Sequence, residues 1–168
     1  MECSLGIKNK KIRIAFYKGP MNWRTWIVNW RTGGPYTHCE LIMPSGDCIG
    51  ISPEDSPPRI RMKRQEFPDD NWDFIDIMVD QIQIIKIIAF FNSTYGHRYD
   101  WFGMIMSYLL PWFIKHERKW YCSQWIATLL TVSDVYSFNY IKMSPTKLYD
   151  ILSMKVNNGL IDGSVEDA

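Results

Sequence analysis

The sequence predicts one α+β domain, with short strands in its first half and helices in its second half. Three observations lead to this fold class. Before residue 80, apolar residues recur at every second position in short runs, which is the period of a strand. After residue 120, they recur at the spacing of a helix. A chain of 168 residues that is 46% hydrophobic and 22% charged fits a single folded domain.

The strands are predicted from alternation and from the turns that bound them. Positions 12, 14 and 16 are the apolar positions of the first strand, which ends at Gly19-Pro20. A short helix follows, because three tryptophans and an isoleucine between residues 23 and 30 fall on one face. Further strands are predicted at 36–43, 48–51 and 72–79, with a turn at 44–47.

A capping box predicts the start of a helix in the middle of the chain. Asp80 is its N-cap, and Gln83 is the reciprocal residue three positions later. We interpret the apolar segment through Phe91 as a helix, although its isoleucines leave a strand as an alternative. The stretch 101–114, which follows a loop, is also predicted to be helical.

Two more helices are predicted in the last third of the chain. Residues 121–131 carry an apolar stripe at helical spacing. Ser144 is an N-cap followed by a proline at the first helical position, and it opens a helix to about residue 154. We expect a flexible N-terminus at 1–11, the domain at 12–155 and a tail at 156–168.

Charge and hydrophobicity limit the partners and the compartment. The chain has 19 basic and 18 acidic residues, a net charge of +1, so no nucleic-acid partner is expected. The N-terminus lacks the apolar run of a secretory signal, and the uncharged stretch 101–114 is shorter than the roughly 20 residues of a membrane span. We therefore expect a cytoplasmic protein with free thiols, although contact of 101–114 with a membrane surface stays open.

A local basic run at 59–64 is the exception to the balanced charge. If it forms a strand, Arg59, Arg61 and Lys63 share one face. Such a face is typical of a solvated edge strand that is protected by charge. The alternative is that it binds an anionic group of a substrate, such as a phosphate or a carboxylate.

Cys122 is the candidate nucleophile. It lies at the start of a predicted helix, where the unpaired N–H groups and the helix dipole favour a thiolate. His38 is the candidate base, on the predicted strand 36–43, and strand parity places Glu40 on the same face as His38. A Cys–His–Glu triad is therefore a candidate site.

Ordinary structural roles compete with this interpretation. A cysteine on an apolar helix is usually an inert core residue, and a histidine in a strand usually has hydrogen-bond partners. Cys39 and Cys48 are expected to be structural, and Cys3 lies in the N-terminus. A zinc site formed by His38, Cys39, Cys48 and Cys122 is an alternative, but the opposite strand parity of His38 and Cys39 makes joint ligation awkward. We expect no metal and no cofactor.

Two segments together resemble a known family. Gly96-His97-Arg98-Tyr99-Asp100-Trp101, followed by Trp120-Tyr121-Cys122-Ser123-Gln124, resembles the G-x-x-Y-D and C-S-[EQG] signature of the NlpC/P60 cysteine peptidases. No histidine follows Cys122, whereas His38 precedes it. This order resembles the circularly permuted branch of NlpC/P60, with its YiiX-like and phage-type members. The segments 37–42 and 46–49 match the strand, turn and strand around the histidine of that branch.

The resemblance implies a permuted papain-like fold, in which a small antiparallel sheet packs against the helix that carries the cysteine nucleophile. It implies a cysteine-dependent hydrolase that cleaves an amide bond, such as a peptidoglycan-type peptide bond, through an acyl-enzyme. A lipid acyl hydrolase or acyltransferase at the same site is one alternative. A catalytically silent, phage-type binding protein is another.

The resemblance also suggests roles for individual residues. Many permuted members carry the third polar residue on the second strand, where this chain has Ile49, Gly50 and Ile51. We therefore predict Glu40 as the orienting group, with Ser52 as a fallback. Tyr99 falls on the motif tyrosine and is a candidate substrate-binding residue. The other candidate substrate-binding residues are Tyr121, Gln124 and Ser52.

Overall fold

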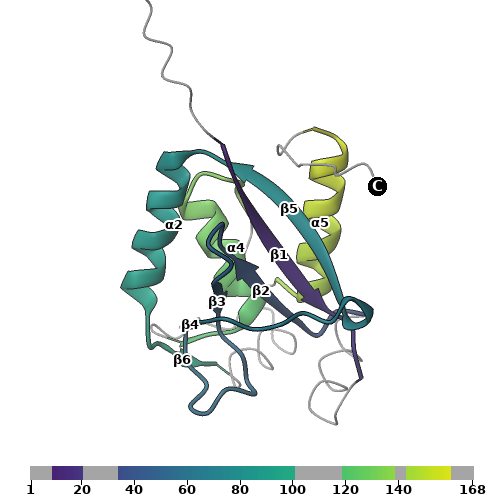
Figure 1. Ribbon diagram of the computed structural model, residues 1–168, viewed down its shortest axis with the longest axis vertical. Helices are drawn as coiled ribbons and strands as arrows, with labels where there is room; N and C mark the ends of the chain where they lie inside the picture. The colour runs from purple at the N-terminus through teal and green to yellow at the C-terminus, as the bar shows by residue number, and fades with distance from the viewer. Residues whose placement is uncertain (1–8, 21–33, 101–118, 139–142, 160–168) are drawn as a thin grey trace, which may run out of the picture.

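The computed structural model describes residues 9–20, 34–100, 119–138 and 143–159 (Figure 1). Within them, a five-stranded antiparallel sheet has the order β4-β3-β2-β1-β5. The fold is α+β, as predicted. The strands of this sheet are β1 (Lys10–Tyr17), β2 (His38–Ile42), β3 (Cys48–Gly50), β4 (Arg61–Lys63) and β5 (Trp72–Val79).

The two long strands, β1 and β5, pair along their whole length, and β2 pairs with the other side of β1. The predicted alternation is confirmed, because Ile12, Ile14 and Phe16 are fully buried. A tight turn joins β2 to β3 at 44–47, also as predicted. Gly46 has φ +84° there, a conformation that glycine adopts without steric cost.

Three helices are described: α2 (Gln81–Thr94), α4 (Cys122–Val132) and α5 (Pro145–Asn157). α4 packs against β2 and β3, while α5 packs against β5 and α2 packs against α4. A 3₁₀ turn, η1 (Asp69–Asn71), precedes β5. A small parallel pair joins β6 (Arg98–Tyr99) to β7 (Lys119–Trp120).

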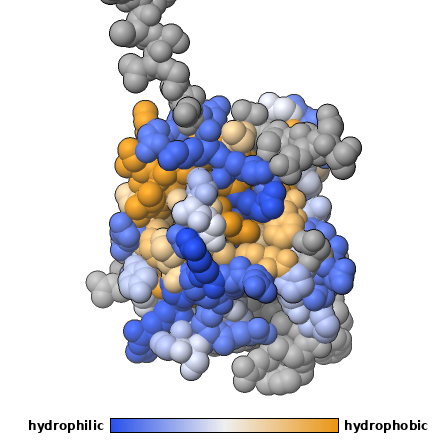
Figure 2. Space-filling model, viewed as in Figure 1, coloured by the Kyte–Doolittle hydropathy of each residue, from blue (hydrophilic) through white to orange (hydrophobic). Residues whose placement is uncertain are grey.

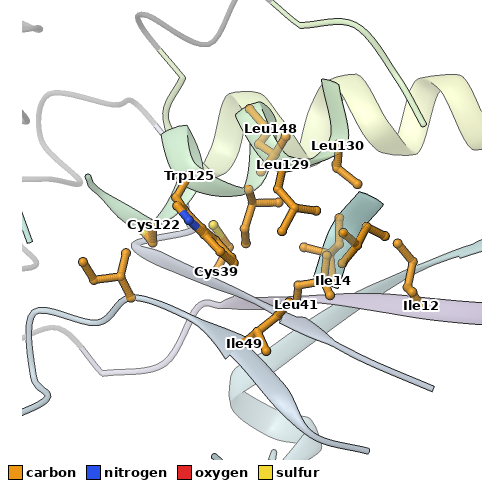
Figure 3. Close-up of a cluster of buried hydrophobic side chains, with 14 of the residues drawn as sticks. Ile12, Ile14, Cys39, Leu41, Ile49, Cys122, Trp125, Leu129, Leu130 and Leu148 are labelled. Atoms are coloured by element: carbon orange, nitrogen blue, oxygen red, sulfur yellow. The ribbon is translucent and has the colours of Figure 1, made fainter. Parts of the chain in front are cut away.

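The core lies between α4 and one face of the sheet (Figure 3). Trp125 and Leu129 of α4 are fully buried against Ile14 and Leu41 of the sheet. All nine residues from Cys122 to Leu130 are buried, so α4 is a central helix rather than a surface helix. This position brings the first residue of α4 close to β2, where the candidate histidine lies.

Several predicted boundaries differ from the observed ones. The strand predicted at 36–43 is shorter, at 38–42, and the basic run forms only the short edge strand β4. The segment after Asp80 is a helix, so the strand alternative is wrong. The capping box explains the helix, because it satisfies two backbone N–H groups at its start. The predicted helices at 23–30 and 101–114 lie outside the described residues.

The last helix is longer than predicted. It continues to Asn157 rather than ending near residue 154, because the backbone N–H of Asn158 still donates to the carbonyl of Met154. The predicted tail at 156–168 therefore begins inside a helix. Among the described residues, no helix is both long enough and apolar enough to cross a membrane.

The capping box gives a first test of the fold. The Asp80 side chain accepts from the N–H of Gln83 at 2.7 Å, and the Gln83 side chain accepts from the N–H of Asp80 at 2.9 Å. Asp80→Ala is expected to lower the free energy of unfolding by about 1 kcal/mol. Chemical denaturation measures this change. Asp150→Ala, at an exposed position inside α5, is the matched control and should have less than half the effect.

Candidate active site

Cys122 is the first residue of α4 and is 4% exposed. Tyr121, the N-cap, makes no side-chain capping hydrogen bond to the helix. The partial positive charge of the helix N-terminus therefore lies beside the Cys122 sulfur without a capping carboxylate or hydroxyl from residue 121. Such a position favours the thiolate form of a cysteine.

His38 is the first residue of β2, and its imidazole is 14% exposed. Its Nε2 atom donates to Oε1 of Glu40 at 3.0 Å. Its Nδ1 atom is buried and has no hydrogen-bond partner among the described residues. The charge of Cys122 acts on the imidazole and raises its pKa. Since Nε2 is bound to Glu40, Nδ1 is the ring nitrogen that remains available to the thiol.

The charges of this pair stabilise each other. Burial alone lowers the pKa of His38, but the Cys122 and Glu40 charges and their hydrogen bonds outweigh it and raise that pKa to about 10. The pKa of Cys122 lies well below its ordinary value. A hydrogen bond from the Cys39 thiol is the main cause, and the His38 charge adds to it against the effect of burial. Both shifts favour the charged forms of the pair, a thiolate and an imidazolium.

Cys39 has a role that sequence reasoning missed. Strand parity correctly places it on the core face of β2, away from His38, and it is fully buried. Its thiol lies beside the Cys122 sulfur, and Figure 3 draws both residues between α4 and β2. Burial raises the pKa of Cys39 well above its ordinary value, so it stays a thiol that can donate to the Cys122 thiolate. Only the packing of α4 on β2 creates this contact.

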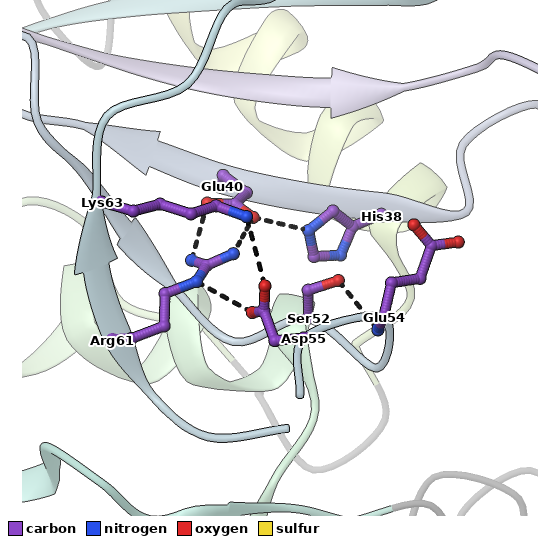
Figure 4. Close-up of polar contacts among 7 residues, drawn as sticks. All are labelled: His38, Glu40, Ser52, Glu54, Asp55, Arg61 and Lys63. Carbon is purple, nitrogen blue, oxygen red and sulfur yellow. Dashed lines mark hydrogen bonds and ion pairs between the residues drawn. The ribbon is translucent and has the colours of Figure 1, made fainter. Parts of the chain in front are cut away.

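Glu40 is buried, at 1% exposure, and is bound on two sides (Figure 4). Arg61 of β4 donates through Nη1 to Oε2 at 2.9 Å and through Nη2 to Oε1 at 2.6 Å. Burial raises the pKa of Glu40, but the bonds from His38 and Arg61 outweigh it and lower that pKa to about 2. The carboxylate is therefore ionised across the physiological range.

The prediction for the basic run needs a correction at Arg61. The side chain of Arg61 is 15% exposed and lies against Glu40, so it belongs neither to a solvated edge nor to an open anion site. The other two residues of that face agree better with the solvated edge, because Arg59 is exposed and the Lys63 side chain is 38% exposed. The prediction was wrong at Arg61 because strand parity alone does not show a buried carboxylate on a neighbouring strand. The buried Glu40 requires a cationic partner, and Arg61 supplies it.

The other predicted site residues are all buried. Tyr99 and Tyr121 belong to the same apolar cluster as Cys122, and Gln124 is 5% exposed on α4. Their substrate-binding roles stay predictions. The oxygen of Ser52 accepts from the N–H of Glu54 at 3.2 Å, and it is Glu40 that contacts the imidazole. Ser52 is therefore not needed as the orienting group.

The two halves of the signature meet in space. Arg98 and Tyr99 pair in parallel with Lys119 and Trp120, directly before α4. The N–H of Asp100 donates to the carbonyl of Trp120 at 2.8 Å. The pairing of β6 with β7 thus holds the backbone that leads into Cys122. This pairing brings the two motif segments side by side.

The chain matches no family model, no curated protein and no solved structure. The resemblance to the permuted NlpC/P60 branch therefore rests on the quoted motifs. In the described part of the chain, no group of three or more histidine, cysteine or acidic residues could hold a metal ion.

The thiolate pair predicts a distinct reactivity for Cys122. In the wild type, iodoacetamide should alkylate Cys122 at pH 6 faster than Cys48, whose pKa is raised by burial. His38→Ala removes the imidazolium, so the pKa of Cys122 rises and its rate at pH 6 should fall about tenfold or more. Peptide mapping by mass spectrometry measures both rates. An ordinary thiol profile that His38→Ala leaves unchanged would contradict the assignment.

Proposed function

We propose that this protein is a cysteine hydrolase that cleaves an amide bond, with Cys122 as nucleophile, His38 as base and Glu40 as orienting group. The observation that carries the proposal is the packing of α4, with Cys122 at its start, against β2, where His38 donates to the Glu40 carboxylate at 3.0 Å. The opposite pKa shifts of Cys122 and His38 agree with this placement. A nucleophile, a base and a third group in hydrogen-bond contact are the general arrangement of covalent catalysis by cysteine.

The residues suggest a two-step reaction. The Cys122 thiolate attacks the carbonyl carbon, and the oxyanion is stabilised at the N-terminus of α4 by the Cys122 backbone N–H. The imidazolium gives its Nδ1 proton to the leaving nitrogen, so the C–N bond breaks, the amine departs and a thioester remains. His38 then takes a proton from water, and the hydroxide attacks the thioester. The acid is released, and the thiolate and imidazolium form again.

The fold supports a permuted papain-like assignment in its order of elements. The strand with the histidine comes before the helix with the cysteine, and the sheet packs directly against that helix. The buried α4 fits a helix that carries a nucleophile, because a rigid element positions the sulfur. We expect the substrate to be a peptide, including peptidoglycan-type peptides.

Hydrolysis of defined peptides tests the function. The wild type, incubated with N-acylated and stem-type peptides, should release a free amine and form a thioester on Cys122 that mass spectrometry detects. His38→Ala should lower kcat by about 10²- to 10⁴-fold, and Cys122→Ala should abolish turnover. Cys48→Ala is the matched control and should stay active. Absence of any adduct or turnover, with an unreactive Cys122, would favour a catalytically silent binding protein.

One observation favours the lipid alternative. Ile82, Ile85 and Ile88 of α2 are 65%, 57% and 44% exposed. Figure 2 shows apolar surface on the side of the molecule where α2 lies. An enzyme that acts on lipid acyl chains needs such a surface to reach a bilayer.

Vesicle flotation decides between the two substrates. If the lipid alternative is correct, the wild type floats with phosphatidylcholine or phosphatidylglycerol vesicles, and Ile85→Glu lowers the bound fraction several-fold. Met154→Glu, at an exposed site on α5, is the matched control and should bind like the wild type. Our proposal of a peptide substrate predicts instead that the wild type does not float with the vesicles and is recovered in the unbound fraction.

A further inference from the structure

The charged groups at the candidate site form a chain of alternating sign that runs from the buried Glu40 to the partly exposed Lys63. Arg61 contacts Glu40 on one side, and its Nε lies 2.8 Å from Oδ2 of Asp55 on the other. Lys63 ends the chain, with its Nζ 3.2 Å from Oδ1 of Asp55. Figure 4 shows the part of this chain from His38 to Lys63. The members in order are Cys122, His38, Glu40, Arg61, Asp55 and Lys63.

Glu40 of β2 and Arg61 of β4 contact each other across β3, which lies between their strands. Glu40 lies opposite Ala15 of β1, and Arg61 lies opposite Gly50 of β3. A Cβ atom at Gly50 would lie 3.6 Å from both Nη1 of Arg61 and Oε2 of Glu40. Gly50 thus lies beside both the guanidinium and the carboxylate, where Arg61 reaches across β3 to Glu40.

The guanidinium of Arg61 lies between two carboxylates. Nη1 and Nη2 donate to Glu40. Nε lies 2.8 Å from Oδ2 of Asp55 as an ion pair, without hydrogen-bond geometry. The two parallel bonds to Glu40 fix the plane of its carboxylate, since both oxygens are held at once.

We propose that Arg61, braced by Asp55, is a positioning residue that holds Glu40 as an ionised, acceptor-only carboxylate and thereby aims Nδ1 of His38 at Cys122. This inference rests on the proposed function, because it concerns the same nucleophile and base. It adds two residues of the sheet edge and its preceding loop to the machinery, neither of which touches the reacting atoms.

The chemistry of the imidazole explains why an ionised Glu40 matters. A carboxylate can only accept, so it must receive the proton on Nε2, and Nδ1 then exchanges a proton with the thiol. A protonated Glu40 could instead donate its O–H to Nε2. The neutral ring would then carry its proton on Nδ1 and could not accept one from Cys122. A buried acid without a cationic partner tends to this neutral form, because burial raises its pKa.

The test is the pH profile of Cys122 alkylation in variants of Arg61. Arg61→Met leaves Glu40 without its clamp, so Glu40 takes up a proton at higher pH and the imidazolium loses its counter-charge. The acid limb of the profile should therefore move to higher pH by about 1 to 3 units. A role in folding alone would change stability but would leave this limb where it is.

The controls keep the outcome unambiguous. Arg64→Met removes a charge just after the same strand, and its side chain pairs with Asp47 rather than Glu40, so its profile should match the wild type. If Arg61→Met does not fold, Arg61→Gln replaces it, because an amide still donates to Glu40 while the charge is lost. For Arg61→Gln, too, the acid limb of the Cys122 alkylation profile is expected to move to higher pH.

The results separate the two proposals. A folded Arg61 variant with the wild-type profile overturns the positioning role, while the reactive Cys122 of the wild type leaves the proposed function standing. A wild type whose Cys122 behaves as an ordinary thiol, independent of His38, overturns both. A shifted acid limb in the Arg61 variant, with an unshifted one in Arg64→Met, supports both.

Discussion

The carboxylate of Glu40 is the constraint on which the rest of the candidate site depends. A buried carboxylate stays ionised only where charged partners or hydrogen-bond donors replace its lost hydration; otherwise its pKa rises and it becomes neutral. Glu40 has one partner in His38 and a bidentate one in Arg61. Each partner is itself paired further out, so the charges at the site are balanced.

The compensation of the Glu40 charge involves parts of the sheet that lie far from the Cys122 sulfur. The edge strand β4 supplies the guanidinium, and the loop before it supplies Asp55. Gly50 lies beside both Glu40 and Arg61, where the charged row crosses β3. The opposite face of β2 meets a different requirement, because Cys39 and Leu41 pack into the core beneath α4. One five-residue strand thus joins the apolar core to the polar site.

Much of the fold could be predicted from local patterns. The period-two run in β1, the capping box of α2 and the Ser-Pro start of α5 are each determined by residues that are close in sequence. For the same reason, the face shared by His38 and Glu40 followed from strand parity. The ends of elements were less predictable, because hydrogen bonds such as that from Asn158 to Met154 add a turn without changing the pattern.

The sequence by itself determined which residues could do chemistry: a cysteine at the start of a helix, and a histidine and a glutamate on one face of a strand. It left the roles of Cys39 and Arg61 open or misassigned. Only the tertiary structure decided these, since α4 brings the Cys122 sulfur to Cys39, and the sheet order places β4 two strands from Glu40. Contacts between segments that are distant in sequence depend on packing and strand register. The local periodicity of the sequence cannot predict them.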